Sequence, residues 1–141
     1  MRRHLDLSFA ETQSLNQILT ELSEQNKHPR PLSLDRLLQR WEYFVSKVER
    51  TYNDSIYEYT NELSIRDIIE DMLSRSPDPL RDKVMALVQE DDNRFAEVTR
   101  PLQKTICRSA KQREDYWWWL RIPKKLSKEL ENDLRSEGTI E

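Results

Sequence analysis

Glycine is almost absent from this chain, since Gly138 is the only glycine among 141 residues. Two-residue β-hairpin turns favour Asn-Gly, Asp-Gly or Gly-Gly, so a fold made of many hairpins is disfavoured. The loops that cradle phosphates in P-loop and dinucleotide-binding proteins also need glycines at fixed spacing. The sequence therefore favours an all-α fold and excludes nucleotide binding by these two motifs.

The length predicts one domain over residues 1–141, with residues 1–7 and 136–141 frayed. Hydrophobic residues make up 36 % of the chain and charged residues 35 %, which leaves a small core. Four Trp, five Tyr and three Phe are more aromatic residues than a disordered segment usually carries. We therefore expect a folded bundle with a small hydrophobic core.

Cysteine and histidine are rare as well. Cys107 has no second cysteine with which to form an intramolecular disulfide, and one thiol with His4 and His28 cannot build a structural zinc site. The first residues do not form the apolar core of a signal peptide, and no apolar run is long enough to cross a bilayer. We expect a cytoplasmic protein without a membrane partner or a cofactor, with surface histidines and a buried structural cysteine.

The first two helices are the clearest. Ser8 and Glu11 form a capping box before an apolar stripe that ends near Asn26, and the prolines of residues 28–31 predict a connector. A second helix begins after Ser33 and carries a wide apolar stripe. Its apolar positions are Leu34, Leu37, Leu38, Trp41, Phe44, Val45, Val48 and Tyr52. This helix is expected at the centre of the core.

Later segments give weaker helical patterns. A short helix is predicted within residues 53–63, and a separate one from Ser64, whose side chain resembles an N-cap, to Pro77. Asp78 followed by Pro79 marks another start, with a possible interruption at residues 90–93 and an end at Pro101. A last short helix holds Leu126, Leu130 and Leu134. The fold prediction is thus a single compact helical bundle of about five or six helices.

The charge of the chain is polarised. Residues 61–100 contain ten acidic and six basic side chains, whereas residues 101–128 contain eight basic and two acidic ones. Within the basic part lies the segment 116–123, which is too short and too aromatic for a helix. We expect it to form an irregular or short extended strap over the bundle.

Three consecutive tryptophans are the most unusual feature of this strap. In an extended segment, neighbouring side chains point to opposite sides, so Trp117 and Trp119 should face away from the core if Trp118 faces it. The rings either close a core that is poor in aliphatic residues or form a recognition surface, since tryptophan and arginine dominate binding hot spots.

The favoured functional hypothesis is a non-enzymatic protein-interaction module of the inhibitor, antitoxin or immunity-protein kind. Another protein is the expected partner, and the charge polarity is also compatible with a homodimer. The candidate anchors are Trp117, Trp119 and Arg121. The carboxylates expected to steer a basic partner are Glu90, Asp91 and Asp92.

A magnesium-dependent hydrolase is the competing hypothesis. Glu58 and Glu62 would share one helix face, and Asp67 and Glu70 would lie on the next helix, so that two facing helices present four carboxylates. Residues 58–71 loosely resemble the all-helical nucleoside triphosphate pyrophosphohydrolases, whose pattern is Glu-x-x-Glu followed by Glu-x-x-Asp. The first pair departs from that pattern by one residue, and the second has the two types reversed. The resemblance implies hydrolysis of a nucleotide or another phosphorylated small molecule with Mg²⁺.

Nucleic-acid binding is the third hypothesis. Residues 104–125 interleave basic and aromatic side chains, as in proteins that stack single-stranded bases on rings. The net charge of −3 and the acidic segments on both sides favour neutralisation within the protein instead.

Overall fold

The computed structural model describes residues 5–27 and 32–141, apart from the side chains of residues 108, 109 and 111. This part of the chain forms five α-helices, which confirms the predicted all-α bundle. The helices are α1 (Phe9–Gln25), α2 (Leu34–Arg50), α3 (Ile56–Arg75), α4 (Asp78–Val98) and α5 (Lys128–Ser136). His4, His28 and the predicted connector 28–31 lie outside the described residues.

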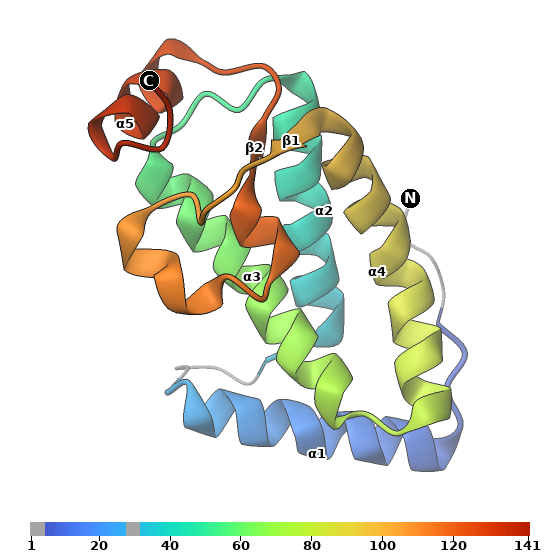
Figure 1. Cartoon of the computed structure of the whole chain (residues 1–141). Coiled ribbons are helices and arrows are strands. Elements are labelled where there is room, and N and C mark those ends of the chain that lie inside the picture. Colours follow the sequence, from blue (N-terminus) through green and yellow to red (C-terminus); the bar gives the residue numbers. More distant parts are fainter. Residues whose placement is uncertain (1–4, 28–31) are drawn as a thin grey trace.

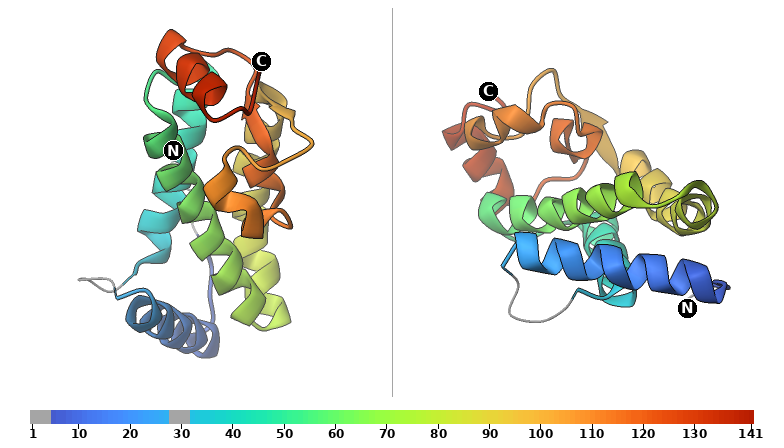
Figure 2. Two further views of the ribbon diagram at one scale, coloured as in Figure 1. Left: turned by 60° about the vertical axis from the view of Figure 1, so that its left-hand side comes forward. Right: turned by 90° about the horizontal axis from the view of Figure 1, so that it is seen from below.

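Helices α2, α3 and α4 run side by side, and α1 crosses one end of them (Figure 1). The segment between α4 and α5 covers the face of α3 that is turned away from α2, as the view from below shows (Figure 2). From here on, the strap means residues 99–123 of this segment, which include the predicted strap at 116–123. Helix α3 is therefore enclosed between α2 and the strap.

The core is centred on α2, as its wide apolar stripe predicted. Trp41 and Phe44 are fully buried on this helix. The Phe44 ring lies 5.2 Å from that of Tyr59 on α3 and 5.8 Å from that of Phe95 on α4. The Phe44 ring thus contacts aromatic rings on both neighbouring helices. The buried apolar residues of all five helices and of the strap form one cluster.

Helix α3 is continuous, which corrects the prediction of two helices with a start at Ser64. Ser55 caps α3, accepting a hydrogen bond from the backbone N–H of Glu58. The Ser64 hydroxyl instead donates to the carbonyl oxygen of Thr60, four residues earlier, at 3.1 Å. Serine makes this bond inside a helix, and its local sequence resembles that of a cap, so the sequence pattern was ambiguous.

Helix α4 also runs without the interruption expected at residues 90–93. Asp91 and Asp92 are 7 % and 3 % exposed. Asp91 binds Arg94 one turn later on α4, and Asp92 binds Arg66 of α3. These charged partners allow consecutive carboxylates to lie inside the bundle without breaking the helix.

The strap begins and ends as a small antiparallel sheet. Strand β1 (Thr99–Pro101) pairs with β2 (Arg121–Pro123), with Arg100 opposite Ile122. Between them the chain forms two 3-10 turns, Arg108–Arg113 and Trp117–Leu120. Residues 116–123 were expected to form an irregular or short extended strap, and the structure confirms an irregular one, in which the Trp run itself is a 3-10 turn.

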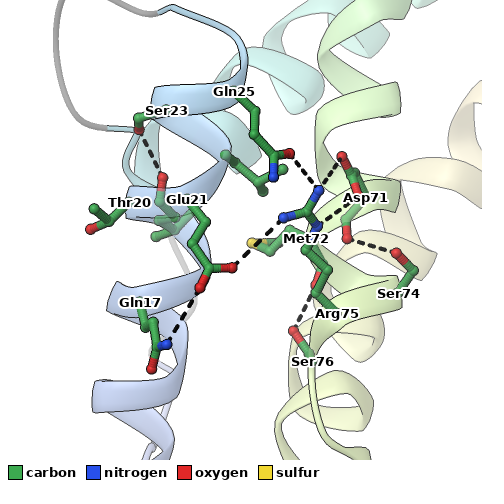
Figure 3. A network of polar contacts seen from close by, with 12 residues as sticks. Gln17, Thr20, Glu21, Ser23, Gln25, Asp71, Met72, Ser74, Arg75 and Ser76 are labelled. Atoms are coloured by element: carbon green, nitrogen blue, oxygen red, sulfur yellow. Dashed lines mark hydrogen bonds and ion pairs between the residues drawn. The ribbon is translucent and has the colours of Figure 1, made fainter.

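A polar contact fixes α1 across the end of α3 (Figure 3). The Arg75 guanidinium donates to Gln25 Oε1 of α1 at 2.6 Å and to Asp71 Oδ1 of its own helix at 3.0 Å. Glu21 of α1 lies 3.7 Å from the same guanidinium. The arginine therefore bridges a carboxylate on each helix.

The last helix packs against the start of α3. Asp133 of α5 accepts a hydrogen bond from the backbone N–H of Ile56 at 2.9 Å. After α5, Gly138 adopts a φ of +74°, a conformation that glycine reaches without steric cost, and Thr139 then contacts the carbonyl oxygen of Ile106 in the strap. Among the described residues, no helix is both long and apolar enough to cross a bilayer.

Candidate functional site

Asp67 of α3 holds two of the three tryptophans in place. The indole N–H groups of Trp118 and Trp119 both donate to Asp67 Oδ1, each at 2.7 Å. Arg113 of the strap lies 3.1 Å from Asp67 Oδ2, and its guanidinium stacks 4.7 Å from the centre of the Trp119 ring. Burial raises the pKa of the Asp67 carboxyl, although these three donors act in the opposite direction.

A buried ion pair lies beside this cluster. Arg66 is 2 % exposed and binds Asp92 with two hydrogen bonds, at 3.0 and 2.9 Å. Asp92 also accepts the indole N–H of Trp41 at 3.0 Å, and Glu70 accepts a further bond from Arg66 at 3.0 Å. The Arg66 guanidinium lies 4.3 Å from the centre of the Trp118 ring. Such a pair needs all of its hydrogen bonds to offset the desolvation of two charges.

The orientation of the Trp run differs from the prediction for an extended segment. Trp118 and Trp119 are each 2 % exposed, whereas Trp117 is 37 % exposed. The 3-10 turn rotates successive side chains by about a third of a turn instead of half, so two neighbouring rings can face α3 together. The expectation that Trp119 faces away from the core is therefore wrong, and the surface position belongs to Trp117.

Trp117 lines a groove of about 800 Å³ between α3, α4 and residues 115–118. Its ring lies 6.0 Å from that of Phe95 and meets the Trp118 ring edge-on at 5.7 Å. Within the described residues, no hydrogen bond uses the Trp117 indole N–H. The groove thus has a fixed aromatic wall with an unused hydrogen-bond donor, which makes it our candidate binding site.

The other predicted partner-binding residues lie elsewhere. Arg121 donates to the Thr99 hydroxyl at 2.7 Å and to the backbone oxygens of Ala96 and Thr99, so its guanidinium ties β2 to the end of α4. Glu90 is exposed on α4. Asp91 and Asp92 were expected to form an acidic surface with Glu90, but both side chains are buried. Asp92 binds the buried Arg66, and Asp91 binds the half-buried Arg94.

The four candidate metal ligands do not lie on two facing helices, because all of them belong to the single helix α3. Asp67 and Glu70 are bonded to side chains of the protein. Glu62 lies 4.0 Å from Arg40 of α2, and Glu58 is exposed near the start of α3. Within residues 5–27 and 32–141, no group of three or more carboxylate, histidine or cysteine side chains is arranged to hold a metal ion.

The basic residues of the strap are divided between internal contacts and the surface. Arg113 and Arg121 are bonded inside the protein, and Lys104 donates to the backbone oxygen of Gly138 at 3.0 Å. Lys124 and Lys125 are exposed beyond β2. Nucleic-acid binding through residues 104–125 stays a prediction.

Several residues of the site were not predicted from the sequence. Arg66, Asp82 and Asp115 come from three separate parts of the chain, and nothing in their local sequence distinguishes them from other charged residues on helices or turns. The pairing of α3 with α4 and the path of the strap bring them together. Trp117 was the exception, because a run of three tryptophans is conspicuous by itself.

Comparison of this chain with protein-family models, with curated proteins and with solved structures gives no match.

Proposed function

We propose that this protein is a non-enzymatic interaction module that binds a partner protein in the groove lined by Trp117. The observation that carries this proposal is the position of the Trp117 ring. It is 37 % exposed at the wall of an 800 Å³ groove, while its two neighbours in the run are buried. Tryptophans in such positions are frequent hot spots of protein interfaces.

The ring of Trp117 is already held in place before any partner arrives. Phe95 supports it from α4, and Trp118, itself bonded to Asp67, supports it from the strap. A binding side chain that is fixed in advance loses little conformational freedom when the partner binds. The groove therefore offers a preformed contact.

The kind of module is part of the same proposal. An inhibitor, antitoxin or immunity protein acts by surface complementarity, which requires a rigid, shaped surface and no catalytic group. We place this activity in the cytoplasm, with another protein as the partner. Binding between two copies of the chain is the alternative arrangement that the charge polarity allows.

Affinity capture from a lysate of the source organism tests this proposal. Wild-type protein is compared with Trp117→Ala and with the matched control Tyr57→Ala, whose ring is 77 % exposed on α3 outside the groove. We expect a stoichiometric partner on the wild-type and Tyr57→Ala proteins and its loss from Trp117→Ala. Thermal unfolding of both variants must show that the fold is intact.

Two results would contradict the proposal. A partner that stays bound to folded Trp117→Ala does not use the groove, and a partner that is lost only from Tyr57→Ala binds the opposite end of α3. Size-exclusion chromatography of the wild-type protein at two concentrations identifies self-association as the alternative.

A further inference from the structure

The two buried tryptophans of the run share one arrangement. The Arg66 guanidinium stacks on the Trp118 ring and is bound by Asp92. In the same way, the Arg113 guanidinium stacks on the Trp119 ring and is bound by Asp67. In both cases a planar cation stacks on the indole while a carboxylate holds the cation in place. Arginine suits this geometry because its guanidinium is flat and binds carboxylates through several N–H groups.

Trp117 lacks this cation. Within the described residues, no arginine or lysine stacks on its ring, although the ring lines the groove. Two carboxylates, Asp82 of α4 and Asp115 of the strap, line the same groove, are exposed and form no ion pair in the described part of the chain. The third tryptophan thus has an open ring and shares its groove with two carboxylates, but within the described residues no guanidinium stacks on it.

Both arginines that line the groove already have carboxylate partners. Arg66 is neutralised by Asp92 and Glu70, and Arg81 forms an ion pair with Asp78 at the start of α4. Two carboxylates share the single positive charge of Arg66, and Asp82 and Asp115 have no cation in the described part of the chain, so the uncompensated charge is negative. A cationic occupant is therefore electrostatically complementary to this groove, and an anionic one is repelled.

We infer that the groove recognises an arginine side chain in an exposed, basic segment of the partner protein. The guanidinium stacks on Trp117 and binds Asp82 or Asp115, which repeats at the groove the arrangement that the protein uses at Trp118 and at Trp119. This inference rests on the proposed function, since it states the chemistry of the segment that the interaction groove accepts.

The test uses a heptapeptide of alternating glycine and arginine as the probe, with the full chain labelled with ¹⁵N. The indole N–H signal of Trp117, assigned from the spectrum of Trp117→Phe, reports binding at the groove. The matched control peptide carries citrulline in place of arginine, which keeps the shape of the side chain and removes its charge. The protein control is Asp82→Asn with Asp115→Asn, which keeps the Trp117 ring.

We expect the arginine peptide to shift the Trp117 signal in a saturable manner, with the Trp41 and Trp119 signals unchanged. The citrulline peptide and the double variant should each bind about tenfold more weakly, because each lacks one side of the ion pair. Added salt should weaken binding of the arginine peptide to the wild-type protein.

Equal binding of the citrulline and arginine peptides would overturn the inference, and so would the absence of any shift at Trp117. A Trp117 signal that moves when the protein alone is diluted would also overturn it, because a second copy of the chain would then fill the groove. If lysate capture still depends on Trp117 in any of these cases, the proposed interaction module stands and only the arginine chemistry is wrong.

Discussion

The Asp67 carboxylate of α3 accepts the indole N–H of Trp119 at 2.7 Å across 52 residues of sequence. The same oxygen accepts the indole N–H of Trp118, so one carboxylate sets the direction of two large rings. Because the rings of Trp118 and Trp119 are buried against α3, Trp117 is the tryptophan of the run whose ring is exposed at the groove. The candidate binding site therefore depends on a residue that does not line it.

Replacing Asp67 by Ala should destabilise the protein by roughly 2 to 4 kcal/mol, because it leaves two largely buried indole N–H groups without an acceptor. Asp67→Asn should cost less, since its amide oxygen can still accept. Urea unfolding measures both changes. Glu97→Ala, at an exposed position on α4, is the control and should change stability by less than about 0.5 kcal/mol. An Asp67→Ala protein as stable as this control would show that the two hydrogen bonds contribute nothing.

Replacing Arg66 by Met should cost about 3 to 5 kcal/mol, because it leaves the Asp92 charge buried without its cation. The double variant Arg66→Met with Asp92→Leu should recover part of this loss, as the uncompensated charge is gone. The recovery is partial because the Trp41 indole N–H still loses its acceptor. Denaturant unfolding of the two single variants and the double variant gives the coupling energy. Strictly additive losses would contradict the proposed coupling.

Two neighbouring tyrosines should respond differently to the loss of their hydroxyl groups. The Tyr52 hydroxyl is buried and has no hydrogen-bond partner among the residues that the structure describes. Burial raises its pKa, and so do nearby carboxylates, of which Asp54 has the largest effect. The Tyr59 hydroxyl donates to the backbone oxygen of Arg121 at 3.2 Å. We expect Tyr52→Phe to be neutral or stabilising and Tyr59→Phe to cost about 1 kcal/mol. Thermal unfolding distinguishes them, and a larger loss for Tyr52→Phe would reverse the assignment.

Asp67 should make the free energy of unfolding decrease as the pH rises, which is the opposite of the usual effect of a carboxyl group in an ion pair. Burial raises its pKa above the ordinary 3.8, so the folded state favours the protonated form. Its contribution to stability is present below the pKa of the unfolded chain and is lost as the pH rises through the folded-state pKa. The stability of the wild-type protein relative to Asp67→Asn should therefore fall as the pH rises above 3.8, the ordinary pKa of an Asp carboxyl.

Glu49 provides a control of opposite sign. The hydrogen bond from Arg94 lowers the pKa of Glu49 below its ordinary 4.5, so its contribution is present above that value and is lost as the pH falls. The stability of the wild-type protein relative to Glu49→Gln should rise with pH. Urea unfolding as a function of pH measures both pairs, and slopes of the same sign would refute the assignment.

The local sequence was sufficient to predict the fold class and the edges of several elements. The Ser8 capping box and the Ser33 cap each depend on the backbone of the next few residues, so local chemistry fixes them. Asp78 and Pro79 marked the start of α4 to within one residue, but the N-cap is Pro77 and no side chain caps this end. The apolar stripe of α2 likewise predicted the centre of the core. Where the same residue type serves two local roles, as Ser64 does, the local pattern failed.

The sequence by itself determined that this chain forms helices with scarcely any sheet. The scarcity of glycine disfavours hairpin turns, and apolar residues at helical spacing favour helices. Both effects depend only on residues close to one another in the chain. Only the tertiary structure decided which tryptophan is exposed and which acidic side chains are buried. Asp67 meets Trp118 and Trp119, and Arg66 meets Asp92, across 26 to 52 residues of chain. Such pairs depend on how helices and strap pack together, and the spacing of residues along the chain carries no direct record of that packing.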